Sequence, residues 1–451
     1  MENNTQLKEM IRSMVIDVLQ GQKQEAASSQ PIKQAPRGQV EPGVFDTVDE
    51  AIQAGKAAQA RFEDCTLATR EKVIADIRAA MRPRVQELAQ KTVDETGMGR
   101  VADKVLKLNL TLDKTPGVED LVTECETGDN GMTLYELSAY GVIGAVTPST
   151  NPAETLICNT IGMLAAGNAV FFSVHPGAKH LSRLLVSELN QIIAKSIGIE
   201  NLIVTLREPS IESAQEMMLH PDVSLLVVTG GPGVVKQALQ SGKKVIGAGA
   251  GNPPAFVDET ADIKKAAQDI VLGASLDNNI LCIAEKSVVA MRQIEPQLVQ
   301  EMVKAGCVLI ENQQDIQRLV DLTVLPNGTP NKKFVGKNAS VILDAAHIPY
   351  NGDPRLIIMR TPKDHPFAVI EMLMPILPVV TVDSFDEGLD VCLMLEAGLH
   401  HTATMHSLNM ERLNRMARKM KTSIFVKNGP SYAGLGFSGE GTTTFTIATP
   451  T

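Results

Sequence analysis

Residues 141–174 read GVIGAVTPSTNPAETLICNTIGMLAAGNAVFFSV. Two continuous apolar runs, GVIGAV and NAVFFSV, stand on either side of a segment of helical length that opens near Pro152 and closes at Gly167. Apolar strands without polar alternation are buried on both faces, and a helix between two such strands connects them in parallel. The stretch therefore predicts a β-α-β unit within a parallel sheet.

The same alternation continues on both sides of this unit. Strands are expected in NLIVTL, VSLLVVTG and KKVIGAG, with amphipathic helices between them, and a second α/β set extends from about 252 to 425 and includes PPAFV, CIAEKSVVA and ILPVVTV. Helical patterns cover 47–63, 68–95 and 100–115, and a short extended pair covers 132–146. The fold class is therefore α/β with doubly wound parallel sheets, which bind ligands at the carboxyl ends of their strands.

Length and composition exclude several classes of protein. The 451 residues exceed what one hydrophobic core usually supports, so two or three domains are expected. The net charge of −10, without a basic run, argues against a nucleic-acid partner. No apolar run reaches the length of a membrane span, and the six scattered cysteines offer neither a C-x-x-C zinc motif nor a disulfide framework. A cytoplasmic protein without a metal site is expected.

The first 42 residues differ from the rest. Residues 1–20 place apolar side chains at helical spacing, and residues 21–42, rich in Gln, Ser, Ala and Pro, resemble a flexible linker. The apolar positions are Leu7, Met10, Ile11, Met14, Val15, Val18 and Leu19. Such a helix is marginal alone in water and needs a surface. It either docks on its own domain or, the interpretation we favour, acts as a detachable docking tag.

Two strand-to-helix connections carry candidate binding groups. In TPSTNPAE (147–154), the amide of Asn151 is a suitable oxyanion donor, and the alternative is that it caps the following helix. In VVTGGPGVV (227–235), Gly230 and Gly231 leave backbone N–H groups open at a helix N-terminus, as a phosphate-binding turn requires. Glycines in such a connection also serve backbone geometry alone.

Three further motifs are ambiguous by themselves. GAGAGN (247–252) lacks the third glycine of a dinucleotide fingerprint and precedes two prolines, so we interpret it as a turn where the backbone approaches another group closely. HHTATMH (400–406) lacks acidic or thiol partners for a metal, and one histidine acting as a base near Cys282 is the better interpretation. In LDNNILCIAEK (276–286), Cys282 is either a nucleophile or a small hydrophobe at the start of a buried strand, and Glu285 with Lys286 is interpreted as a solvated pair.

The order of these motifs resembles the aldehyde dehydrogenase superfamily. PSTNP, HPGAK, VVTGGPGVV, GAGAGNPP, DNNILCIAEK and EMLMPILPVV follow one another as in its CoA-acylating branch, the aldehyde dehydrogenases of ethanolamine and propanediol utilisation in bacterial microcompartments. The resemblance covers the chain from about Val44 to the end. It implies oxidation of a short-chain aldehyde, acetaldehyde or propionaldehyde, to acyl-CoA, with NAD as cofactor and coenzyme A as co-substrate.

The resemblance also implies roles for individual residues. Cys282 matches the nucleophile, Asn151 with the Cys282 backbone N–H matches the oxyanion site, and His401 matches a histidine that acts as a base. His175 stands where hydrolytic relatives carry a lysine, which leaves the choice between NAD and NADP open. Glu371 matches the carboxylate that holds the nicotinamide ribose. The cofactor-binding residues implied in this way are Thr147, Pro148, His175, Pro176, Gly177, Thr229, Gly230, Gly231, Gly249 and Glu371.

One departure favours CoA over water as acyl acceptor. Hydrolytic relatives have Glu-Leu-Gly-Gly-Lys where this chain has GAGAGN, and that Glu activates the water for deacylation. Water with a pKa of ~15.7 needs such a base, whereas a thiol near ~8.5 does not, a difference of roughly 10 kcal/mol in ionisation. A hydrolytic aldehyde dehydrogenase and a non-catalytic scaffold that kept the fold are the alternatives.

The resemblance finally implies a domain plan. Residues 43–248 would form the NAD-binding domain, with 132–141 as part of an oligomerisation hairpin, and 249–425 the catalytic domain. Residues 426–451 would form a C-terminal oligomerisation arm that ends where members of the family continue. A homo-oligomer, dimer or tetramer, is expected, and the helix of residues 1–20 would bind shell proteins inside a bacterial microcompartment in the cytoplasm.

Overall fold

The computed structural model describes residues 41–449. The expected helix of residues 1–20 and the linker up to residue 40 lie outside this range. Within it, no helix is both long and apolar enough to cross a membrane.

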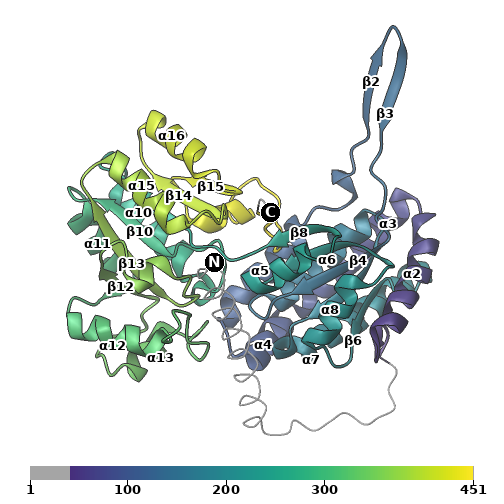
Figure 1. The fold of residues 1–451 in the computed structure, drawn as a ribbon, viewed down its shortest axis with the longest axis horizontal. Helices are drawn as coiled ribbons and strands as arrows, with labels where there is room; N and C mark the ends of the chain where they lie inside the picture. The colour runs from purple at the N-terminus through teal and green to yellow at the C-terminus, as the bar shows by residue number, and fades with distance from the viewer. Residues whose placement is uncertain (1–40, 450–451) are drawn as a thin grey trace, which may run out of the picture. The chain divides into compact units, whose positions relative to one another are not determined.

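The first sheet has six parallel strands in the order β1-β6-β5-β4-β7-β8 (Figure 1). Its strands are β1 (Val44–Phe45), β4 (Val142–Thr147), β5 (Ala169–Val174), β6 (Ile203–Leu206), β7 (Val223–Thr229) and β8 (Lys244–Ala248). From β4 the chain adds β5 and β6 on one side and then β7 and β8 on the other. The strand order therefore reverses between β4 and β7, which is the switch point where doubly wound sheets bind ligands.

The helices that accompany this sheet are α2 (Val48–Glu63), α3 (Leu67–Met81), α4 (Val85–Thr96), α5 (Val101–Lys114), α6 (Pro152–Ala165), α7 (Lys179–Ile197), α8 (Ile211–Leu219) and α9 (Pro232–Leu239). Of these helices, α2, α6, α7, α8 and α9 pack against its strands, and α3, α4 and α5 pack on α6 and α7. The helix expected over 68–95 is two helices, α3 and α4, separated by a 3-10 turn at Arg82–Arg84. Pro83 causes this break, because a proline removes a helical hydrogen bond and clashes with the preceding turn.

The second sheet has seven parallel strands in the order β11-β12-β13-β10-β9-β14-β15. Its strands are β9 (Pro254–Val257), β10 (Ser287–Met291), β11 (Cys307–Leu309), β12 (Leu356–Arg360), β13 (Ile376–Val382), β14 (Thr402–His406) and β15 (Ile424–Lys427). Its helices are α10 (Ile263–Ser275), α11 (Glu295–Lys304), α12 (Gln313–Thr323), α13 (Ala339–Ala345), α14 (Pro366–Val369), α15 (Phe385–Glu396) and α16 (Met410–Met420).

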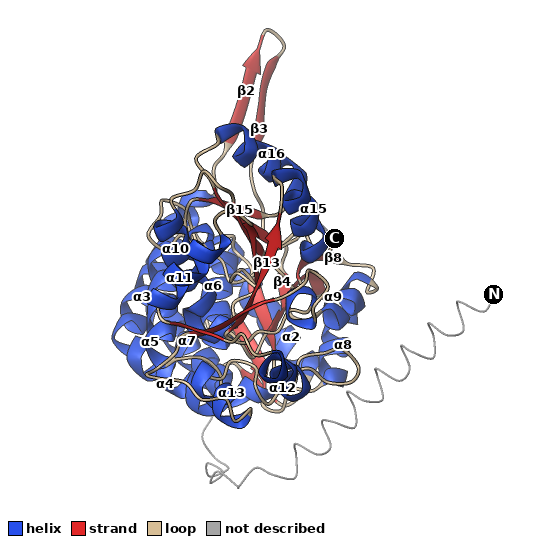
Figure 2. Ribbon diagram, turned by 90° about the vertical axis from the view of Figure 1, so that its left-hand side faces the viewer, coloured by secondary structure: helices blue, strands red, loops and turns tan. Residues whose placement is uncertain are grey.

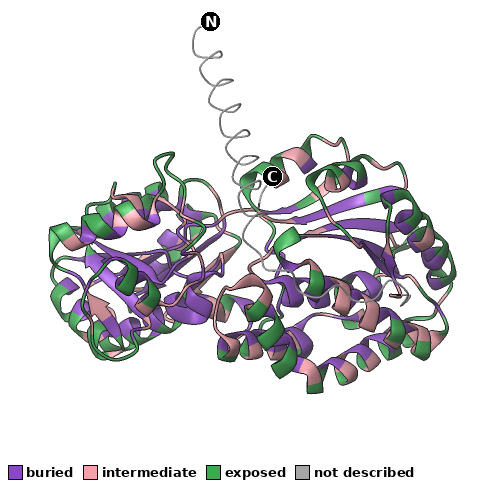
Figure 3. Cartoon of the chain, turned by 90° about the horizontal axis from the view of Figure 1, so that it is seen from below, coloured by how far each residue is buried: buried purple, intermediate pink, exposed green. Residues whose placement is uncertain are grey.

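Both faces of the second sheet are covered by apolar side chains. Ile357 and Ile358 are neighbours on β12, point to opposite faces, and belong to two separate buried clusters. Figure 2 shows strands lying between helices, and Figure 3 shows those strands coloured as buried. The expected α/β class with parallel sheets is confirmed.

A two-stranded antiparallel hairpin, β2 (Glu124–Gly128) and β3 (Gly131–Tyr135), projects from the part of the chain that forms the first sheet (Figure 1). Every residue of both strands is exposed. The extended pair expected over 132–146 is β3 and β4, but β3 pairs with β2 and not with β4. The polar composition of β2, ECETG, concealed this strand.

The last part of the described chain forms no strand after β15. A 3-10 turn at Ser431–Leu435 is followed by irregular backbone as far as residue 449. This segment contacts α5 and β8 of the first sheet's part of the chain. Thr443 N donates to Lys114 O at 2.9 Å, and Thr449 N donates to Gly247 O at 3.1 Å. The extended arm expected here is thus irregular chain that packs on its own subunit.

Candidate active site

Cys282 lies at the end of a turn, five residues before β10 begins at Ser287. The expectation that CIAEKSVVA is strand from its first residue is therefore wrong. Three consecutive residues, Asp277 to Asn279, have positive φ angles of 50°, 56° and 65°. Asn and Asp adopt this left-handed region more readily than other side chains, so the sequence LDNN reverses the chain after α10. Cys282, at the end of this turn, is partly exposed as a residue.

The Lys286 side chain holds the turn together through three hydrogen bonds. Its Nζ donates to Asn279 O at 2.7 Å, Asn279 Oδ1 at 2.6 Å and Leu281 O at 2.9 Å. Glu285 is equally buried and accepts from Ser431 N at 2.8 Å and Ser431 Oγ at 2.7 Å. The interpretation of Glu285 and Lys286 as a solvated pair is wrong. Burial lowers the pKa of Lys286 to about 8 and raises that of Glu285 to about 7.

The electrostatic surroundings keep the Cys282 thiol protonated in the absence of ligands. Burial and the Glu371 carboxylate raise its pKa to about 12, whereas Lys286 and the backbone N–H groups of Cys282 and Ile283 act in the opposite direction. Burial also raises the pKa of Glu371, against the effect of Lys286. A thiol is far less nucleophilic than its thiolate, so reaction requires this balance to change.

The glycine turn of residues 247–252 brings three candidate residues together. A Cβ atom on Gly251 would lie 2.7 Å from Cys282 O and 2.8 Å from His401 Cγ, so only glycine fits there. Gly251 N donates to Glu371 Oε1 at 3.2 Å. The interpretation of GAGAGN as a close backbone approach is confirmed, and the groups it approaches are Cys282 and His401.

His401 is buried and neutral. Its Nδ1 lies 2.9 Å from Thr402 Oγ1, and its Nε2 is buried without a hydrogen-bond partner. Burial and the nearby Lys286 lower its pKa to about 4. With Nδ1 protonated, the imidazole offers an Nε2 lone pair next to the nucleophile turn. Among residues 41–449, no three His, Cys, Asp or Glu side chains are grouped so that they could hold a metal ion.

Asn151 precedes α6, but its side chain makes no capping hydrogen bond. The capping alternative is therefore not realised. Its Oδ1 accepts from Lys107 Nζ at 2.5 Å, and its Nδ2 lies 3.3 Å from Thr150 Oγ1. Lys107 also lies 2.5 Å from Asp277 Oδ2, so the amide is tied through one lysine to the turn that ends in Cys282.

Most of the candidate cofactor residues lie along the carboxyl edge of the first sheet. Thr147 ends β4, His175 follows β5, Thr229 ends β7 and Gly249 follows β8. Pro148 continues from Thr147, Pro176 and Gly177 form the 3-10 turn after His175, and Gly230 and Gly231 precede α9. His175 Nδ1 accepts from Gly177 N at 3.0 Å, so this histidine caps its own turn.

This edge fits a dinucleotide. The open space beside Gly231 and Gly249 would accept a Cβ without contact within 4 Å, so these glycines are not needed for packing and leave room for a ligand. Thr147 Oγ1 is buried at the strand end without a partner. Gly230 N donates to Ala248 O at 3.1 Å, so the expectation of an open N–H at Gly230 is wrong. A phosphate at the N-terminus of α9 would bind the N–H groups of Gly231 and Gly233. Glu371 does not lie on this edge but near Cys282. The turn of residues 249–251 leads from the end of β8 to Glu371, where Gly251 N donates to Oε1.

Four buried charged residues around the site are not among the predicted site residues: Lys104, Lys107, Asp277 and Lys286. The signal for the first two was their spacing. They stand three residues apart in the helix expected over 100–115, in line with Leu108 and Thr111 on its buried face. Lysines on the apolar face of a helix need buried carboxylates, and Asp277 and Glu154 supply them.

The site thus combines a cysteine beside a neutral histidine with open space next to Gly231 and Gly249 at the strand ends. This combination is typical of enzymes that bind their substrate covalently through sulfur while a cofactor takes its electrons. The model of the aldehyde dehydrogenase family matches residues 18–445. The chain belongs to the aldehyde dehydrogenase family, as its motifs predicted.

Individual relatives are similar over nearly the whole length. The chain is 50% identical over 450 residues to propanal dehydrogenase (CoA-propanoylating) of Salmonella typhimurium, covering 100% of this chain and 94% of that protein. The propionaldehyde dehydrogenase of Rhodopseudomonas palustris, solved with bound CoA and an acylated cysteine, is 48% identical with a TM-score of 0.89, covering 91% and 94% of the two chains. A propionaldehyde dehydrogenase of the Clostridium phytofermentans fucose utilisation microcompartment is 47% identical with a TM-score of 0.89, covering 90% and 94%.

Proposed function

We propose that the protein oxidises a short-chain aldehyde, acetaldehyde or propionaldehyde, to the acyl-CoA with reduction of NAD+. The observation that carries this proposal is the glycine turn at the nucleophile. Its backbone approaches Cys282 and His401 within contact distance, and residues 247–251 contain no acid. Without a base at that place, the thiol of CoA is a far better acyl acceptor than water.

The chain's own residues carry the covalent steps. The Cys282 thiolate adds to the aldehyde carbonyl, and Asn151 Nδ2 with the Cys282 backbone N–H stabilises the oxyanion. Bound NAD+ would supply the acceptor for the hydride that the tetrahedral adduct loses. Cys282 is then left as a thioester, which the thiol of CoA attacks to give acyl-CoA and the free cysteine. One aldehyde, one NAD+ and one CoA thus give one acyl-CoA, one NADH and one proton.

Two residues near the sulfur have proposed supporting roles. His401 accepts a proton at Nε2 during thiol attack, as its neutral state and unpartnered nitrogen allow. Glu371 holds the nicotinamide ribose, and the strand-end residues from Thr147 to Gly249 hold the pyrophosphate and adenosine. These assignments rest on the resemblance of the motifs and on the positions given above.

Replacement of the nucleophile tests the proposal. Cys282→Ser should lower NADH formation from acetaldehyde, NAD+ and CoA by at least ~10³-fold, because loss of a covalent nucleophile costs on the order of 10⁶-fold in a serine protease. Circular dichroism should show an unchanged fold. Wild-type turnover should require CoA and yield acyl-CoA. Rapid NADH formation without CoA, with free acid as product, would identify the hydrolytic alternative, and undiminished turnover of the Ser variant would contradict the role of Cys282.

The proposal extends to assembly and location. The β2–β3 hairpin would join copies of the chain into a dimer or tetramer, since its strands are fully exposed in one subunit. Residues 1–20 would bind shell proteins and place the enzyme inside a microcompartment in the cytoplasm. The spacing of their apolar residues supports this, as do relatives of ~47% identity that belong to a microcompartment by their own description.

A further inference from the structure

Lys107 contacts Asn151 and the first residue of the turn that ends in Cys282. It lies on α5, and its Nζ is 2.5 Å from Asn151 Oδ1 and 2.5 Å from Asp277 Oδ2. Asp277 begins the left-handed turn that ends in Cys282. The two proposed donors, Asn151 Nδ2 and the Cys282 N–H, come from segments far apart in the chain, and one buried ammonium connects those segments.

The ammonium group also decides which way the Asn151 amide faces. An ammonium carries three donors and no acceptor, so it can bind the amide oxygen but not the amide nitrogen. Nδ2 is consequently turned away from Lys107, and its contact with Thr150 Oγ1 is long, at 3.3 Å. The positive charge of Lys107 Nζ next to Oδ1 further polarises the amide and strengthens Nδ2–H as a donor.

The charges around Lys107 keep it ionised and fixed. Two lysines, Lys104 and Lys107, face two carboxylates, Asp277 and Glu154, and all four side chains are fully buried. Against the effect of burial, Asp277 and Glu154 hold the pKa of Lys107 above its ordinary value. Asp277 is itself held by Arg100 N at 2.8 Å and, through its own N–H, by Asp103 Oδ2 at 2.9 Å.

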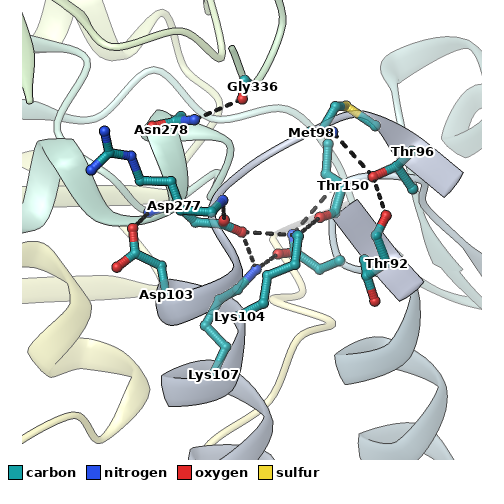
Figure 4. Close-up of polar contacts among 12 residues, drawn as sticks. Thr92, Thr96, Met98, Asp103, Lys104, Lys107, Thr150, Asp277, Asn278 and Gly336 are labelled. Atoms are coloured by element: carbon teal, nitrogen blue, oxygen red, sulfur yellow. Dashed lines mark hydrogen bonds and ion pairs between the residues drawn. The ribbon is translucent and has the colours of Figure 1, made fainter. Parts of the chain in front are cut away.

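Lys104 is a natural comparison for Lys107. It lies one turn earlier on α5, is as deeply buried, and binds the same carboxylate oxygen of Asp277 at 3.0 Å. Its other contact is the backbone carbonyl of Thr150 at 3.2 Å and not the side chain of Asn151. Figure 4 shows both lysines directed at Asp277. Both lysines therefore pair with Asp277, but only Lys107 donates a hydrogen bond to the Asn151 amide.

We propose that Lys107 is a positioning residue for the oxyanion site. It orients the Asn151 amide so that Nδ2 faces the developing oxyanion, and it ties that amide to the turn that presents Cys282. This inference rests on the proposed function. It predicts that loss of Lys107 impairs the chemical step through Asn151, beyond any loss of stability.

Charge-balanced variants test the inference. Lys107→Met with Glu154→Gln removes one ammonium and one carboxylate, and Lys104→Met with Glu154→Gln removes the same charges but leaves the contact between Lys107 and Asn151. We expect the first variant to lose about 10- to 100-fold in kcat for NADH formation with KM for NAD+ unchanged, since loss of one oxyanion donor costs about 10²- to 10³-fold. The Lys104 variant should stay within about threefold of the Glu154→Gln enzyme, because its donor remains oriented. Equal losses in both variants would overturn the inference.

A double-mutant cycle separates positioning from general damage. Asn151→Ala should lower kcat by about 10²- to 10³-fold, and adding the Lys107 and Glu154 changes should cost less than about twofold more, because the group through which Lys107 acts is gone. If the losses in kcat instead multiply in the combined variant, Lys107 acts independently of Asn151. That result would overturn the inference while leaving the proposed function intact. Full turnover of Asn151→Ala alone would instead contradict the oxyanion role in the proposed function. Should the Met variant not fold, Lys107→Gln with Glu154→Gln enters the same cycle, with the same outcomes.

Discussion

At the scale of single residues, the nucleophile shares its surroundings with a competing acid. A charge on Cys282 and a charge on Glu371 oppose each other. Burial disfavours both charges, and Lys286 is the cation near both groups. A pKa of about 12 leaves on the order of one thiolate in 10⁵ at pH 7. The unliganded enzyme therefore holds its cysteine in an unreactive state, which protects it from oxidation.

This balance predicts a pH dependence for alkylation of the unliganded enzyme. Since the thiol pKa is raised, the thiolate fraction grows with pH, and inactivation by iodoacetamide should accelerate by about tenfold per pH unit from pH 7 to 9. Glu371→Gln removes the opposing charge and should raise the rate at each pH, on the order of tenfold, since a nearby charge shifts a pKa by about 1–3 units. Residual activity after timed exposure gives the rate, and mass spectrometry identifies the modified cysteine.

Glu396→Gln is the matched control for that experiment. Glu396 is also a buried carboxyl group near the site and accepts from His401 N at 2.9 Å, but it is not among the main charges that act on Cys282. Its alkylation rate should match that of the wild type. A wild-type rate that is already constant between pH 7 and 8 would show an ionised thiol and contradict the raised pKa.

Residue roles were accessible from the sequence only where a motif carried them. Cys282 and Asn151 stand in recognisable motifs, and the structure ties their two segments together through Lys107. Lys107 itself belongs to no motif. Its partner Asp277 is 170 residues away, and no local pattern encodes which buried lysine meets which carboxylate. The solvated Lys286 predicted from the sequence is wrong, because that prediction follows the usual exposure of charged side chains. Its burial depends on the turn carbonyls of Asn279 and Leu281 that it binds, which no local pattern encodes.

At the scale of elements, apolar strands were predictable and the polar hairpin was not. The strands β4 to β8 are continuous apolar runs and coincide with the expected segments. The strand β2 has no apolar pattern, because its side chains do not face the core of their own subunit. Likewise the break between α3 and α4 depends on Pro83, in a segment whose apolar periodicity continues across it.

The hairpin carries its aliphatic side chains on one face, and Tyr135 lies on the other face opposite Glu124. Directly opposed residues share a face, so Cys125 pairs with Leu134, and Thr127 with Met132, on the same side. Leu134 and Met132 are 57% and 66% exposed in the single subunit. An isolated two-stranded hairpin is only marginally stable in water. A second copy of the chain that covers this face would stabilise it.

The hairpin therefore predicts a mutation that weakens assembly. Leu134→Glu should convert the oligomer to smaller species at micromolar concentration in light scattering coupled to size exclusion, because burying one Leu contributes about 1.5–3 kcal/mol and a buried carboxylate opposes association. Thr133→Lys lies on the opposite face of the same strand, paired with Glu126, and should leave the mass unchanged. An unchanged mass for Leu134→Glu would contradict the interface.

At the scale of the whole molecule, the site depends on both sheets but on a limited part of the chain. The amide and its lysine come from the part of the chain that forms the first sheet, the nucleophile turn and His401 from the part that forms the second, and the C-terminal segment packs beside them, where Thr446 Oγ1 lies 2.8 Å from Thr229 Oγ1. The residues proposed for catalysis, positioning and cofactor binding run from Lys107 to His401. Residues 1–20 lie outside that range, and their apolar stripe leads us to propose that they serve location.

Deletion of residues 1–20 tests this division of labour. Since none of the residues proposed for catalysis or cofactor binding lies in this segment, kcat and KM of the shortened enzyme should stay within about twofold of the full chain. Binding to purified microcompartment shell proteins should be lost, because an amphipathic helix binds through its apolar stripe. Within the full chain, Met14→Glu interrupts that stripe and should weaken shell binding at least tenfold, since it places a charge among apolar positions that are proposed to contact the shell. Ser13→Glu, one position away and outside the stripe, should not. Reduced turnover of the shortened enzyme would show instead that this segment docks on its own subunit and belongs to the catalytic body.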